Sequence, residues 1–158
     1  MPASAEPEAE REITIVRETD VPARFLFRAW SRPELLVEWY GPPGCPLVEC
    51  DVDFRVGGHF RFAMKGPDGV TMRPFGGHYL AIEENRLVRY DSASEEPGAE
   101  KMIVTVRFDE SARGTTITMH TLFASAAMMR EHSGRGYVGG VNAALDQLLA
   151  LAREGKHA

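Results

Sequence analysis

Apolar and polar residues alternate along most of the chain between residues 47 and 122, most regularly where every second residue from Met102 to Phe108 is apolar. A period of two indicates strands with one buried and one exposed face. One of these strands is expected at residues 70–82, with a bulge or bend at Pro74 and the glycines after it. The connections are too short for the crossovers that parallel strands need. The region therefore predicts antiparallel hairpins.

Two short helices are expected between a first strand at residues 11–19 and the alternating region. Asp20 is the expected N-cap of the first helix, with Pro22 in its first turn, where proline is tolerated. Pro33 lies in the first turn of the second helix, which ends before the Gly-Pro-Pro-Gly sequence at residues 41–44.

A long amphipathic helix is expected at the C-terminal end, because apolar residues from Val138 to Ala152 recur at the spacing of one helix face. Glycines between residues 134 and 140 weaken its start, since each costs about 1 kcal/mol relative to alanine. Residues 126–136 are therefore expected to be a loose lead-in. This helix is the only element large enough to cover the apolar face of the sheet. The predicted class is α+β.

Length and composition restrict the function classes. A chain of 158 residues suits one domain, expected at residues 11–155, after a disordered tail at residues 1–10 that is rich in Ala, Pro and Glu. The 18 basic and 23 acidic residues argue against nucleic-acid binding. No apolar run approaches the ~18 residues of a membrane span. Without a secretory signal, and with only Cys45 and Cys50, the protein is expected to be soluble and cytoplasmic.

The common catalytic and metal-binding motifs are missing from the sequence. It contains no Cys-x-x-Cys, His-Glu-x-x-His or Gly-x-Ser-x-Gly motif and no Gly-x-x-x-x-Gly-Lys phosphate loop, and its five histidines are scattered. We therefore expect no metal, no cofactor and no catalytic nucleophile.

Four segments together resemble a known family. They are SRPELLVEWYGPPG at residues 31–44, VDFRVGGHFRFAMKGPDG at 52–69, GGHYLAIEENRLV at 76–88 and GTTITMHTLF at 114–123. The chain resembles the SRPBCC group of the START and birch-allergen superfamily, in the branch named after the C-terminal domain of the activator of the heat-shock-protein-90 ATPase. The resemblance covers about residues 11–153, and its most specific parts are the Arg-x-Gly-Gly pattern at residues 55–58 and the Pro-Asp-Gly turn. Tyr137 stands where the family often has tryptophan.

The resemblance implies a helix-grip fold, in which a seven-stranded curved antiparallel sheet wraps around the long C-terminal helix and a cavity lies between them. It also implies binding of hydrophobic or amphipathic small molecules. Our leading interpretation is a protein that binds such a molecule, or a lipid, without catalysis. Apolar burial would supply the affinity and one or two polar groups would orient the ligand.

The candidate ligand-binding residues are those expected to face this cavity. His78 is included because strand alternation puts it in phase with Leu80 and Ile82, on the inner face, and Tyr90 because it is in phase with Val88. Trp30 and its aromatic neighbours on the two short helices are expected near the cavity mouth. The full set is Trp39, Phe60, Phe62, His78, Tyr90, Val104, Met119, Met128, Tyr137, Val141 and Leu145.

Two other functions stay open at this point. A cyclase- or hydrolase-like enzyme acting on a polyketide-type substrate would need a general acid or base in the cavity, for which His78 and Tyr137 are the candidates. A cochaperone that stimulates a chaperone ATPase follows from the family's name alone. The sequence also leaves a homodimer open.

Overall fold

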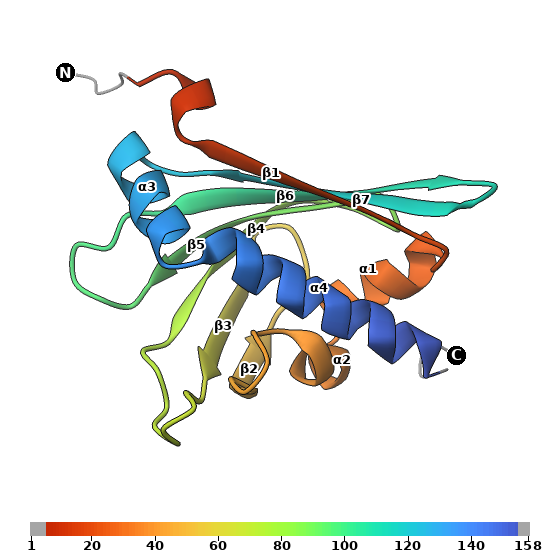
Figure 1. Cartoon of the computed structure of the whole chain (residues 1–158), viewed down its shortest axis with the longest axis horizontal. Coiled ribbons are helices and arrows are strands. Elements are labelled where there is room, and N and C mark those ends of the chain that lie inside the picture. The colour runs from red at the N-terminus through yellow and green to blue at the C-terminus, as the bar shows by residue number, and fades with distance from the viewer. Residues whose placement is uncertain (1–5, 155–158) are drawn as a thin grey trace.

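The computed structural model describes residues 6–154, and its seven strands form one antiparallel sheet (Figure 1). The strands are β1 (Glu12–Thr19), β2 (Leu47–Val52), β3 (His59–Met64), β4 (Phe75–Glu83), β5 (Leu87–Ser94), β6 (Met102–Ser111) and β7 (Gly114–Leu122). Their order in the sheet is β1-β7-β6-β5-β4-β3-β2. Every neighbouring pair except β1 and β7 is consecutive in the chain, which confirms the expected hairpins.

The helices gather on one side of this sheet, and α4 runs across that side with α2 next to it (Figure 1). They are α1 (Ala23–Ser31), α2 (Pro33–Trp39), α3 (Ala126–Gly134) and α4 (Tyr137–Arg153), preceded by a short 3₁₀ turn, η1 (Glu8–Glu10). Leu145 and Leu148 of α4 are fully buried in the core that the helix shares with the sheet. The expected α+β helix-grip architecture is confirmed.

The inner face of α4 differs from the expected one at its first turn. Val138 is 41% exposed, whereas Tyr137 points inward and its hydroxyl hydrogen-bonds Thr121 Oγ1 at 2.8 Å. Successive residues of an α-helix point about 100° apart. Once Tyr137 occupies the inward position, Val138 is turned toward solvent.

Two helix starts also differ from the sequence prediction. The N-cap of α1 is Pro22 rather than Asp20, because the residue before a proline is pushed out of the helical region and Val21 therefore stays outside the helix. The expected loose lead-in is the helix α3. Ser125 caps it by accepting a hydrogen bond from Met128 N at 3.0 Å. This cap satisfies a backbone donor of the first turn.

Strand β4 begins later than expected and contains a bulge. It starts at Phe75, directly after Pro74, which has no N–H to give to a ladder. The register with β5 shifts between Tyr79 and Ala81, so that Leu80 is an extra residue. One extra residue reverses which side chains face inward. Tyr79 is therefore buried and Leu80 is exposed.

Part of the expected N-terminal tail lies against the body of the protein. The η1 turn lies within it, and Glu6 Oε1 accepts a hydrogen bond from Ala126 N at 3.0 Å. Residues 1–5 of the expected tail and residue 155 of the expected domain lie outside the described residues. None of the described helices is both long and apolar enough to cross a membrane.

Candidate functional site

An apolar cavity of about 250 Å³ lies between α4, the end of α2 and the sheet. It is lined by Trp30, Trp39, Tyr40, Gly41, Pro42, Met64, Phe75, Met102, Met119, Tyr137, Gly140, Val141, Ala144 and Leu145. None of these residues carries a formal charge at neutral pH. Because a cavity of about 150 Å³ lined by aliphatic and aromatic side chains holds benzene, this one has room for a molecule of about two rings.

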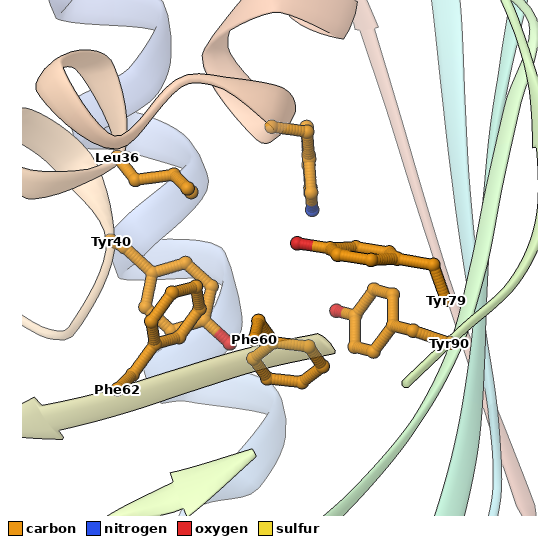
Figure 2. A pocket seen from close by; sticks show the side chains of 7 residues that line it. Leu36, Tyr40, Phe60, Phe62, Tyr79 and Tyr90 are labelled. Carbon is orange, nitrogen blue, oxygen red and sulfur yellow. The ribbon is translucent and has the colours of Figure 1, made fainter. Parts of the chain in front are cut away.

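A small aromatic recess adjoins the cavity, and Trp30 and Tyr40 line both spaces. The remaining walls of the recess are Leu36, Phe60, Phe62, Tyr79 and Tyr90. In Figure 2 the hydroxyl groups of Tyr79 and Tyr90 point into this space. The volume of the recess is about 10 Å³, which is room for about one water-sized atom.

The recess is held in shape by ring-to-ring contacts. The ring of Phe60 lies 5.7 Å from that of Tyr79 and 5.3 Å from that of Tyr90, measured between centroids. Such tilted and edge-to-face pairs add roughly 0.5–1.5 kcal/mol each beyond area burial. The phenol groups are therefore held in fixed orientations.

A side chain of α4 holds the end of α2 over the cavity. Gln147 Nε2 donates hydrogen bonds to the carbonyl oxygens of Trp39, at 2.9 Å, and Gly41, at 2.7 Å. Gly41 has a φ of +97°, a backbone conformation that favours glycine. This turn places Trp39 and Tyr40 against the cavity.

All four tyrosines of the chain line the cavity or the recess: Tyr40, Tyr79, Tyr90 and Tyr137. Burial raises the pKa of each phenol above its ordinary value of about 10. The hydrogen bond between Tyr137 and Thr121 offsets part of this shift at Tyr137. The phenols therefore remain protonated at neutral pH and are available as hydrogen-bond donors.

These shifts predict how the folded protein responds to alkaline pH. An unfolded chain releases phenol protons at about pH 10, whereas the folded chain holds them to higher pH. The free energy of unfolding is therefore unaffected by these groups below about pH 10 and falls as the pH rises above it. Near-ultraviolet absorbance should show no tyrosinate at pH 10 while circular dichroism remains native. Ionisation near pH 10 in the folded protein would contradict the buried placement.

Most of the residues predicted from the sequence are brought together here. Five line the cavity: Trp39, Met119, Tyr137, Val141 and Leu145. Three line the recess: Phe60, Phe62 and Tyr90. The other three, His78, Val104 and Met128, border neither space.

The predicted inward placement of His78 is wrong. Its side chain is 59% exposed, on the face of β4 opposite Tyr79, and its backbone N donates to Asp91 Oδ1 at 2.8 Å. The cause is the bulge at Leu80, which reverses the alternation that the prediction assumed. The residue that faces the recess is Tyr79.

Val104 and Met128 are displaced for different reasons. Val104 lies on β6, and its side chain is fully buried in the core. Met128 lies on α3 and lines a separate polar hollow with Arg73, Glu131 and Arg135. Because residues 126–134 form the capped helix α3, Met128 lies on that helix and not at the cavity.

The sequence prediction missed several lining residues, chief among them Tyr79, Phe75 and Met102. Tyr79 lies opposite Tyr90 on the neighbouring strand only because of the bulge at Leu80, so the regular alternation of the sequence carried no signal for it. Among residues 6–154, no group of three or more His, Cys, Asp or Glu side chains is arranged to hold a metal ion.

Comparison with known proteins identifies the family of the chain. The family model for activator of Hsp90 ATPase homolog 1-like proteins matches residues 20–153. No curated protein matches the chain.

Solved structures from several bacteria share the fold. A protein from Nitrosomonas europaea is similar at a TM-score of 0.87 and 24% identity, over 96% of this chain and 100% of its own. A solution structure from Arthrobacter aurescens reaches 0.84 at 24% identity, over 95% and 90%. The AHSA1 protein from Silicibacter pomeroyi reaches 0.74 at 20% identity, over 90% and 99%. These likenesses show the fold alone. The family match, which covers most of the chain, shows that it belongs to the activator of Hsp90 ATPase homolog 1-like family of the SRPBCC superfamily.

Proposed function

We propose that the protein binds a small hydrophobic ligand in the cavity between α4 and the sheet, without catalysis. The observation that carries this proposal is the cavity itself: about 250 Å³, apolar, and free of charged lining residues. Apolar burial supplies the affinity in such a site, and a few polar groups fix the orientation. Here those polar groups are the phenols and Trp30.

The chemistry of the lining favours binding over catalysis. No His, Asp, Glu, Lys or Cys borders the cavity or the recess. A general acid or base works best with a pKa near the operating pH, whereas burial moves the pKa of every phenol here away from neutrality. Of the two acid–base candidates from the sequence, only Tyr137 lines the cavity. The cyclase- or hydrolase-like alternative is therefore less well supported.

Protein partners are not part of this proposal. The family name by itself does not establish an ATPase partner for this chain. The chaperone partner and the homodimer stay predictions from the sequence.

Native mass spectrometry tests the proposal. The protein is measured as purified, and again after incubation with a lipid and polyketide extract and with 2-isopropylnaphthalene, a neutral two-ring hydrocarbon. We expect a one-to-one adduct that a second hydrophobic ligand displaces. A folded protein that retains no adduct from either source would contradict the proposed function.

A further inference from the structure

Trp30 has a buried indole N–H that no protein group accepts. The residue is 5% exposed, and its Nε1 is the one buried side-chain nitrogen or oxygen without a hydrogen-bond partner in the part of the chain that the structure describes. The other tryptophan, Trp39, donates its Nε1 to the carbonyl oxygen of Ala29 at 3.0 Å. An indole nitrogen is a donor only, and a buried donor without an acceptor is costly.

The unpaired indole borders the recess into which two phenols point. The hydroxyls of Tyr79 and Tyr90 are directed into this space (Figure 2). Burial dominates the raised pKa of Tyr90, and the neighbouring Trp30 indole, whose N–H does not meet the geometry of a hydrogen bond to the Tyr90 hydroxyl, offsets part of that shift. Four side chains that can donate hydrogen bonds, Trp30, Tyr40, Tyr79 and Tyr90, therefore line one small space.

The size of the recess matches a single oxygen atom. Its volume of about 10 Å³ holds no more than about one water-sized atom. Trp30 and Tyr40 line both the recess and the larger cavity. A ligand whose hydrocarbon part fills the cavity therefore has to pass only this shared boundary to place one oxygen in the recess.

The surroundings exclude an oxygen that carries a full charge. No lining residue is cationic, and a buried carboxylate without a cation is strongly unfavourable. A carbonyl oxygen is neutral and accepts two hydrogen bonds through its two lone pairs. It can therefore accept one hydrogen bond from Trp30 Nε1 and one from a phenol of the recess.

We propose that the ligand is a neutral carbonyl compound, a ketone, aldehyde or amide with an apolar body, whose oxygen accepts one hydrogen bond from Trp30 Nε1 and one from a neighbouring phenol. This inference rests on the proposed ligand-binding function and adds the chemical class of the ligand. It makes Trp30 the residue that distinguishes a carbonyl compound from a hydrocarbon of the same shape.

Three naphthalenes that differ at one substituent test it: 2-acetylnaphthalene, 2-isopropylnaphthalene and 2-naphthoate. Their affinities are measured by calorimetry for the wild type and for Trp30→Phe, which removes the N–H. We expect Trp30→Phe to weaken the binding of the ketone about tenfold more than that of the hydrocarbon, because both ligands sense the changed cavity wall and only the ketone loses a hydrogen bond. Comparing each ligand with itself removes the difference in hydrophobicity between them. The naphthoate should bind more weakly than the ketone.

Trp39→Phe is the matched control, because it removes an indole N–H that is already bonded to the protein. It should change the affinities for ketone and hydrocarbon by the same factor. Thermal melting of each variant shows whether it is folded.

The indole signals of the nuclear magnetic resonance spectrum give a second, direct measurement. The chain has two tryptophans, so the spectrum contains two indole N–H signals, which the two variants assign. The ketone should move the Trp30 proton downfield, and the hydrocarbon should not. The Trp39 signal serves as an internal reference.

The outcomes separate this inference from the proposed function. If ketone and hydrocarbon both bind, respond equally to Trp30→Phe and leave the Trp30 proton without a downfield shift, the carbonyl inference is overturned and the cavity stands. Tighter binding of the naphthoate would overturn the neutral class. If no naphthalene binds to the folded protein, the proposed function fails and the inference fails with it.

Discussion

Val141→Trp is expected to weaken ligand binding by about a hundredfold or more while the protein stays folded. Val141 lies midway along the part of α4 that lines the cavity and is only partly buried. An indole at this position occupies the space that the ligand needs, and each loss of about 1.4 kcal/mol in binding free energy is tenfold in affinity. Titration with 2-isopropylnaphthalene, together with thermal melting, measures both quantities.

Val138→Trp is the control for this change. It makes the same substitution one turn earlier on α4, at a side chain that is 41% exposed and does not border the cavity. We expect binding within about twofold of the wild type, because Val138 does not border the cavity. The variant should also stay folded, because surface substitutions usually change stability by less than about 0.5 kcal/mol. Wild-type binding by a folded Val141→Trp protein would refute the location of the site.

Gly58→Ala is expected to destabilise the fold by about 3 kcal/mol or more, enough to unfold a marginal domain. An added Cβ would overlap the carbonyl oxygen of Asp53, which is backbone and cannot move aside without distorting the turn. This turn also supports the recess. Tyr79 N donates to Gly58 O at 3.0 Å, and Gly57 N donates to Tyr79 O at 2.9 Å.

Gly139→Ala provides the comparison for this prediction. Gly139 is exposed in α4, and an added Cβ meets nothing within 4 Å. Alanine should therefore stabilise the protein by roughly 0.5–1 kcal/mol. Urea unfolding should show a lower free energy of unfolding for Gly58→Ala and a higher one for Gly139→Ala than for the wild type. Equal midpoints for the two variants would contradict the structural role of the Gly57-Gly58 turn.

The hairpins of the sheet were predicted well because the sequence patterns that indicate a hairpin are local. Alternation and short connections define each hairpin, as between β6 and β7, without knowledge of the rest of the chain. The pairing of β1 with β7, which sets Ile15 opposite Met119, is not local. The sequence prediction placed the first strand in the sheet only through the resemblance to a family, and it did not name the neighbour of that strand.

The candidate site was predicted less well, because one extra residue in a strand exchanges the side chains that face inward for those that face outward. A bulge leaves little trace in the sequence, and the bulge at Leu80 exchanged His78 for Tyr79 at the recess. Beyond the first turn of α4, where Val138 is exposed, the predicted inward direction of helical residues was more reliable, since a continuous helix keeps its phase. Val141 and Leu145 both line the cavity as expected. The helix that Ser125 caps was not predicted, because the glycines between residues 134 and 140 argue against a helix there.

Small residues on the cavity-lining face of α4 can be replaced by larger ones without changing the residues that hold the sheet together. Gly140 and Ala144 lie one turn apart and both border the cavity, and a Cβ added at Gly140 meets nothing within 4 Å. Each carbon added on this helix face reduces the ligand volume and leaves the ladders of the seven strands unchanged. Under the proposed function, single substitutions on this one helix would therefore change which ligand fits, while the sheet keeps its structure.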